Sequence, residues 1–135
     1  MDAATRRLVR ERAQDRCEYC RLPQGAQPYV TFHIEHILPR KHGGSDDLLN
    51  LALACERCNA FKGTDLSGID PDTGNVERLF DPRTQNWPEH FELREAVICG
   101  HTPAGRATVA VLGMNEDRRG QLRAELLALG QFDLA

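Results

Sequence analysis

The chain has 135 residues, of which 41% are hydrophobic and 27% are charged, and its formal net charge is −3. This length suits one small globular domain and leaves no room for two sizeable ones. No apolar run approaches the roughly 20 residues that a membrane-spanning helix needs. Residues 1–16 lack the apolar centre of a signal peptide. We therefore expect a cytoplasmic protein without membrane contact, in which thiols stay reduced.

Charge is distributed unevenly along the chain. Residues 1–63 carry ten Lys and Arg against eight Asp and Glu, whereas residues 64–135 carry seven against twelve. A polyanion should therefore favour the N-terminal half. The difference is too small to indicate nucleic-acid binding without further support.

The N-terminal half is predicted to form a helix, two strands and a second helix. Residues 3–16 place apolar side chains near one face, which predicts an amphipathic helix. Residues 29–36 predict a strand, and residues 48–55 predict a second strand or extended segment. Residues 38–47 between the strands are predicted to form a loop, because their glycines and proline interrupt regular structure. A short helix should follow over 55–63, where a glycine stops it.

The C-terminal half gives weaker signals. Residues 64–90 are rich in turn-forming residues and predict a surface wrap with little regular structure. Residues 91–100 suggest a strand or hairpin. Residues 102–114 begin with a Thr cap and a Pro, which predicts a helix, and 116–129 predict a terminal helix. Together the elements indicate a small single domain of the α+β class.

Four of the five cysteines form two C-x2-C pairs. Cys17 with Cys20 and Cys55 with Cys58 are separated by 34 residues. Zinc prefers four thiolates in a tetrahedron, and each short pair supplies two. The sequence therefore predicts a closed, structural Zn²⁺ site, with buried core cysteines or redox pairs as the alternative. The fifth, Cys99, is expected to be a core residue.

Between these pairs, residues 32–39 read FHIEHILP and place two histidines and a glutamate in a strand-like run. Unpaired buried charges cost free energy, so these groups need partners, a metal ion or a chemical task. Neighbouring strand residues point to opposite faces, so Glu35 and His36 reach one site only if the strand ends or bulges there. A satisfied ion pair in the core is the structural alternative.

Residues 17–63, CEYC … HIEHILPRKHGGSDDLLNLALACERCNAFKG, resemble the HNH endonuclease family in its four-cysteine, zinc-bearing branch. The resemblance implies a ββα-metal core that grips one divalent cation and cuts nucleic-acid phosphodiesters. It implies that His36 is the general base and that Asn50 orders the loop and orients this base. It also implies two ligands of the cation. These are Glu35, where relatives commonly have aspartate, and Asn59, where many relatives have histidine.

On this basis the chain divides into two parts. Residues 1–63 would hold the N-terminal helix and the zinc-bearing nuclease core. Residues 64–135 would form a C-terminal extension packed on the same domain. This extension could complete the core, set the target preference or bind a partner.

The chemistry of phosphodiester hydrolysis requires the residue types that this motif contains. An imidazole can take a proton from water, and a hard cation held by carboxylate and amide oxygens can stabilise charge on the phosphate. Oxygen ligands suit Mg²⁺ or Mn²⁺, with other divalent cations as alternatives. His33 is a further candidate for contact with the cation or a phosphate, and its structural alternative is a hydrogen bond to the backbone.

Basic residues surround the motif. The candidates for phosphate contacts are Arg40, Lys41, His42, Arg57 and Lys62, and a solvated basic surface is the alternative for each of them. Gly43 and Gly44 either let the backbone approach the strand being cut or make a turn.

The leading hypothesis is a metal-dependent endonuclease that acts on DNA. RNA stays open as a substrate, and the chain could be a monomer or a homodimer. The rival hypothesis is a non-catalytic, zinc-stabilised nucleic-acid-binding module, which would not need the combination of Glu35, His36, Asn50 and Asn59. A zinc-only redox or chaperone protein would fit the cysteines and leave the segment between them unexplained.

Overall fold

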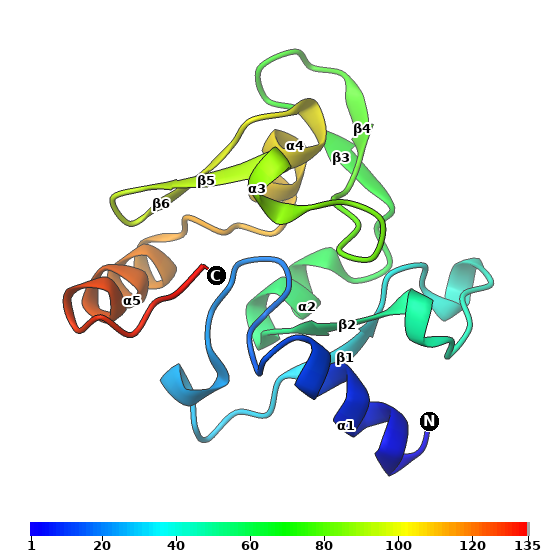
Figure 1. Cartoon of the computed structure of the whole chain (residues 1–135). Coiled ribbons are helices and arrows are strands. Elements are labelled where there is room, and N and C mark those ends of the chain that lie inside the picture. Colours follow the sequence, from blue (N-terminus) through cyan, green and yellow to red (C-terminus); the bar gives the residue numbers. More distant parts are fainter. Residues whose placement is uncertain (135) are drawn as a thin grey trace. The chain divides into compact units, whose positions relative to one another are not determined.

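The computed structural model describes residues 1–134, and the chain forms two compact units, Met1–Asp65 and Leu66–Ala135. Each unit combines helices with antiparallel strand pairs (Figure 1), which confirms the α+β class. In the part of the chain that the structure describes, no helix has the length and apolar character needed to span a membrane.

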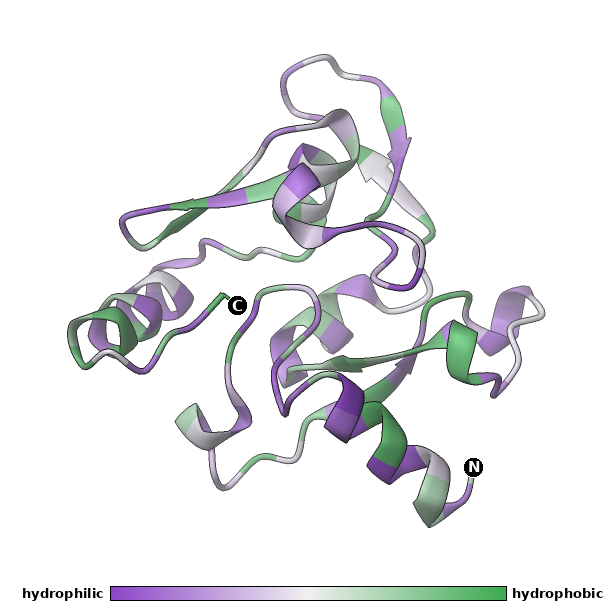
Figure 2. Ribbon diagram, in the orientation of Figure 1, coloured by the Kyte–Doolittle hydropathy of each residue, from purple (hydrophilic) through white to green (hydrophobic). Residues whose placement is uncertain are grey.

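Helix α1, Ala3–Arg12, opens the first unit. Asp2 caps the helix, because its carboxylate accepts a hydrogen bond of 2.8 Å from the backbone N–H of Thr5. Hydrophilic and apolar residues alternate along α1 (Figure 2), and Val9 is fully buried. The helix ends at Arg12 and does not reach residue 16, because Gln14 and Asp15 have positive φ angles.

Two arginines of α1 tie the helix to the strands. Arg10 donates a hydrogen bond of 2.9 Å to the carbonyl of Phe32. Arg12 donates to the carbonyls of Leu48 and Leu51, at 3.0 Å and 2.7 Å. These contacts fix α1 against the segments that lead into both strands.

Strand β1, His33–His36, pairs in antiparallel fashion with β2, Leu51–Ala54. All four residues of β2 are buried, and Figure 2 shows this strand as largely hydrophobic. Both strands are shorter than predicted. Tyr29 is 99% exposed ahead of β1, and residues Leu48–Asn50 form a 3₁₀ turn ahead of β2.

Helix α2, Glu56–Lys62, follows β2 and completes a ββα arrangement. Cys55 caps the helix, because its Sγ accepts a hydrogen bond of 3.4 Å from the N–H of Cys58. The helix ends at Gly63, as predicted. Two further 3₁₀ turns, Gln24–Ala26 and Arg40–His42, lie in the connections of this unit.

In the described residues of the second unit, two hairpins combine with three helices. These are β3 (Ser67–Ile69) with β4 (Val76–Arg78), β5 (Phe91–Arg94) with β6 (Val97–Gly100), and helices α3 (Trp87–His90), α4 (Pro103–Val111) and α5 (Asp117–Ala128). The hairpin over 91–100 and helices α4 and α5 agree with the sequence analysis. The β3–β4 hairpin and α3 lie in the segment that was predicted to have little regular structure.

Aromatic residues form the centre of the second unit. Phe80 and Phe91 meet edge to face with ring centroids 5.1 Å apart, and Trp87 lies 5.0 Å from Phe91. Thr108 links this cluster to α4, since its hydroxyl accepts from the N–H of Phe80 at 2.8 Å and donates to the carbonyl of Ala104 at 2.7 Å. Trp87 and Phe91 are both buried packing residues.

A buried ion pair joins the β3–β4 loop to α4. Arg106 donates two hydrogen bonds to the carboxylate of Asp70, at 3.0 Å and 2.8 Å, and Asp70 is fully buried. The backbone N–H of Asp72 and the hydroxyl of Thr73 donate to the same carboxylate. The hydrogen bonds from Arg106 hold the pKa of Asp70 at about 2, below its usual value of 3.8.

Candidate active site

The four cysteines of the C-x2-C pairs converge in the first unit. Their Sγ atoms all lie within 4.8 Å of one another, and all four residues are buried. The Sγ atoms of Cys20 and Cys55 are 3.6 Å apart. A tetrahedral Zn²⁺ with thiolates at about 2.3 Å requires sulfur separations of about 3.8 Å. The donor set therefore fits Zn²⁺.

Burial disfavours the thiolate form of this cluster when no cation is present. It raises the pKa of the Cys17 and Cys58 thiols well above their usual value. A metal ion at the centre would offset that cost by favouring the thiolates. The N–H groups of Cys20 and Cys58 already point at the sulfurs of Cys17 and Cys55, both at 3.4 Å.

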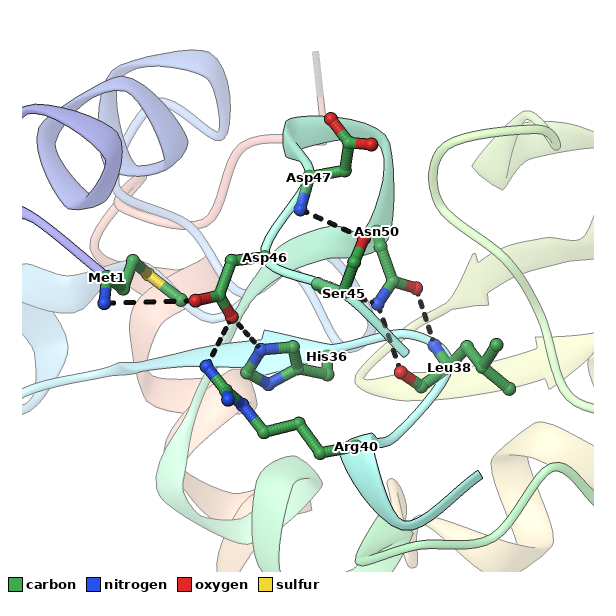
Figure 3. A network of polar contacts seen from close by, with 8 residues as sticks. All are labelled: Met1, His36, Leu38, Arg40, Ser45, Asp46, Asp47 and Asn50. Atoms are coloured by element: carbon green, nitrogen blue, oxygen red, sulfur yellow. Dashed lines mark hydrogen bonds and ion pairs between the residues drawn. The ribbon is translucent and has the colours of Figure 1, made fainter. Parts of the chain in front are cut away.

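His36 lies at the end of β1 and faces Asp46 in the following loop (Figure 3). Its Nε2 is 2.7 Å from Asp46 Oδ1, and the same oxygen accepts from Arg40 at 2.6 Å. The hydrogen bond with His36 lowers the pKa of Asp46. The His36 side chain is 19% exposed. With Nε2 committed to a carboxylate, Nδ1 is the ring nitrogen left to take a proton.

Asn50 closes the loop that carries Asp46 (Figure 3). Its Oδ1 accepts from the N–H of Leu38 at 2.8 Å, and its Nδ2 donates to the carbonyls of Leu38 and Ser45 at 3.0 Å and 2.8 Å. A Cβ on Gly44 would lie only 1.6 Å from the Leu38 carbonyl oxygen, and Gly43 has a φ of +90°. Both glycines therefore serve the turn itself.

Glu35 is held on the side of β1 away from Asp46. Regular pairing with β2 continues through Glu35 and His36, so no bulge turns the two side chains to one face. Glu35 is 5% exposed and accepts a hydrogen bond of 2.8 Å from the hydroxyl of Tyr19. Burial raises the pKa of the Glu35 carboxyl, against the opposing effect of the Lys62 ammonium.

Lys62 forms a buried ion pair with Glu35. Its Nζ lies 2.6 Å from Glu35 Oε1. The same ammonium donates to the carbonyls of Ile37 and His36, at 3.0 Å and 3.4 Å. This cradle of one carboxylate and two carbonyl oxygens holds a positive charge. Lys62 is 3% exposed, so the expectation that it contacts phosphate disagrees with the structure.

The oxygens around Lys62 are the ligand type that a hard divalent cation accepts. Asn59 precedes Lys62 by three residues on the same face of α2 and offers an amide oxygen. The Lys62 ammonium already occupies this position, so the residues as they lie here do not fit a second cation beside Glu35. A divalent ion would have to replace the ammonium, because one buried carboxylate does not offset both charges.

The part of the chain that holds these residues matches a known protein family. Residues 17–65 match the HNH endonuclease family. The HNH match covers less than half of the chain and includes both cysteine pairs and the segment between them. In comparisons with curated proteins and with solved structures, nothing matches the chain. The HNH match supports a nuclease-type hydrolase in general, and the cysteine cluster is consistent with a zinc site.

The other residues expected in the HNH site are spread over the surface of the first unit. Arg40, Lys41, His42 and Arg57 are exposed, as a contact with phosphate requires. His42 Nε2 lies 3.1 Å from the carbonyl of Thr64, and the Arg57 guanidinium lies 6.0 Å from the centre of the Phe61 ring. His33 is exposed and lies in a groove beside His36.

Two residues of the HNH site were missed in the sequence. Asp46 is one of two adjacent aspartates in the Gly-Gly loop, and no spacing rule separates it from Asp47. Tyr19 lies inside the first cysteine pair, where a buried aromatic hydroxyl needs a hydrogen-bond partner. That requirement was the only signal in the sequence for a contact with Glu35.

Proposed function

We propose that the HNH region hydrolyses phosphodiester bonds of DNA with His36 as the general base. The observation that carries this proposal is the contact between His36 Nε2 and Asp46 Oδ1 at 2.7 Å. It leaves Nδ1 of a partly exposed imidazole for chemistry. A module that only binds nucleic acid does not require an imidazole oriented by a carboxylate.

In the proposed reaction, Nδ1 of His36 takes a proton from the attacking water. Asp46 keeps the ring oriented and stabilises the imidazolium that forms, as a carboxylate does for a catalytic histidine. Arg40 donates to the same oxygen of Asp46 and holds the carboxylate in place. Asn50 contributes by fixing the loop on which Asp46 is placed.

Glu35 and Asn59 are proposed to hold a divalent cation, Mg²⁺ or Mn²⁺. When bound, such an ion stabilises negative charge that develops on the phosphate and the leaving oxygen. This assignment requires that the Lys62 ammonium leaves Glu35 and that the Glu35 carboxylate turns toward the face of His36, because regular pairing holds the two side chains on opposite faces of β1. The cysteine cluster is proposed to bind a structural Zn²⁺ that keeps β1, β2 and α2 in place.

The test is a nicking assay on supercoiled plasmid with the zinc-loaded full chain and added Mg²⁺ or Mn²⁺. The wild-type protein should nick the plasmid, and His36→Ala should abolish nicking. His101→Ala, which removes an exposed imidazole from the second unit, should nick like the wild type. Plasmid binding without nicking in either metal would support the non-catalytic module instead. The same assay on an RNA of matched sequence decides between the two substrates.

A further inference from the structure

A groove beside His36 is lined mostly by residues that the proposed reaction does not use. It has a volume of about 440 Å³ and lies between α1 and the segment that enters β1. Its polar lining includes Arg6, Arg10, His33, His36 and Arg40. His36 lines the groove, whereas Glu35 does not.

The groove is positively charged. Three guanidinium groups and two imidazoles line it, and no carboxylate does. A second hollow on α1 shares Arg6 and Arg10 but also includes Glu11 and Asp15. Of the two, the groove beside His36 is therefore the better match for a polyanion.

The positive charge in the groove comes mainly from α1. Arg40 is paired with Asp46 at 2.6 Å, so its charge is partly offset. Arg10 donates to the neutral carbonyl of Phe32 at 2.9 Å, which keeps its charge and joins the two walls of the groove. Arg6 is exposed, and among the described residues its side chain has no hydrogen bond or ion pair. Its guanidinium is available to a ligand.

The walls of the groove are held in place before any ligand binds. Arg10 connects α1 to the chain ahead of β1, and Arg12 connects it to the carbonyl of Leu51 at 2.7 Å. Val9 of the same helix is fully buried. Because the walls are already fixed, a polyanion does not have to order them when it binds.

We propose that this groove binds the sugar–phosphate backbone of the nucleic-acid strand next to the bond being cut, with Arg6 as a direct phosphate contact. The place of the groove relative to the cut bond rests on the proposed function, whereas the claim that Arg6 binds phosphate stands without it. His33 lines the same groove together with Arg6 and Arg10. A backbone contact of this kind adds affinity without sequence preference.

The test compares Arg6→Ala with Arg7→Ala. Both residues are exposed arginines on α1, but Arg7 does not line the groove. Fluorescence anisotropy with a labelled DNA duplex, without added Mg²⁺ or Mn²⁺, reports binding separately from cutting. Arg6→Ala should weaken binding about tenfold at low salt and reduce the slope of log K against log salt by about 0.9. Arg7→Ala should change the affinity less than about twofold and keep the slope. Equal effects of the two variants, or none, would overturn the proposal.

The binding and nicking assays together distinguish a failure of the phosphate-binding proposal from a failure of the hydrolase proposal. Binding that depends on Arg6 in a protein that never nicks plasmid supports the groove and contradicts the proposed hydrolase. Nicking by the wild type, with unchanged binding and nicking by Arg6→Ala, contradicts the groove and leaves the hydrolase in place. Circular dichroism of each variant checks that the exposed substitution has not altered the fold.

Discussion

His36 Nε2 and Asp46 Oδ1 lie 2.7 Å apart across a loop that Asn50 closes with three hydrogen bonds (Figure 3). In the proposed reaction, this contact leaves Nδ1 of His36 as the ring nitrogen that acts on the substrate. Asp46 touches His36 and not the reacting atoms, so we regard it as a positioning residue.

Replacement of Asp46 should therefore slow cleavage without weakening DNA binding. Asp46→Asn should lower kcat about 10–100-fold with little change in KM, the size of effect typical for residues that orient a catalytic group. ¹⁵N NMR of the ring should show the Nε2–H tautomer of His36 in the wild type and a loss of that preference in the variant. Asp47→Asn is the matched control, because Asp47 contacts Ser45 through its backbone N–H. Equal rates for the two variants would contradict the positioning role.

Removal of the zinc ion should unfold the first unit. Apparent binding free energies of structural Zn²⁺ are about 10–16 kcal/mol, which exceeds the stability of most small domains. Chelation or Cys55→Ser should therefore abolish cooperative folding of residues 1–65, measured by circular dichroism and by zinc content. Cys99→Ser, outside the cluster, should retain one zinc ion per chain. A folded wild-type protein that contains no zinc would contradict this assignment.

The buried pair of Glu35 and Lys62 should be revealed by a double-mutant cycle. Lys62→Met leaves the Glu35 carboxylate buried without its counter-ion and should cost about 3–5 kcal/mol in urea unfolding. Glu35→Gln in the same chain should recover part of that loss, since no unpaired charge then stays buried. Lys41→Met, at an exposed position, should stay within about 0.5 kcal/mol of the wild type. Additive effects of the two core substitutions would contradict a direct ion pair.

The second unit should lose stability in acid through Asp70. Its pKa is depressed to about 2 in the folded chain from an ordinary 3.8. The unfolded state therefore binds the proton more readily, so the stabilisation is complete above about pH 4 and is lost as the pH falls toward 2. Thermal unfolding between pH 5 and 2 should show this loss in the wild type and a weaker pH dependence in Asp70→Asn. Asp117→Asn, at an exposed position of the same unit, should keep the wild-type pH dependence.

The parts of the site that follow from local spacing could be predicted from the sequence. Each C-x2-C pair brings two sulfurs together within one short turn, and the observed cluster joins the two pairs. The start of α2 at the second pair and its end at Gly63 follow from a cap and a glycine, which act within a few residues. The hairpin at β5 and β6 carries a similarly local pattern.

The parts that depend on tertiary pairing could not be predicted. The partner of Glu35 is Lys62, 27 residues further on, and only the packing of α2 against β1 brings them together. The sequence alone left both a cation ligand and a core ion pair open for Glu35. The side of the strand that each residue faces also depended on whether β1 bulged, and the pairing with β2 is regular.

The most direct test of the account is the source of the oxygen in the cut ends. A labelled DNA duplex would be incubated with the zinc-loaded protein and Mn²⁺ or Mg²⁺ in H₂¹⁸O, and the products analysed by mass spectrometry. If His36 activates water, each cut should introduce one ¹⁸O into the terminal phosphate, and His36→Ala should yield no cut ends. Cut ends without ¹⁸O, or cleavage that persists in His36→Ala, would contradict the assignment of His36 as the general base.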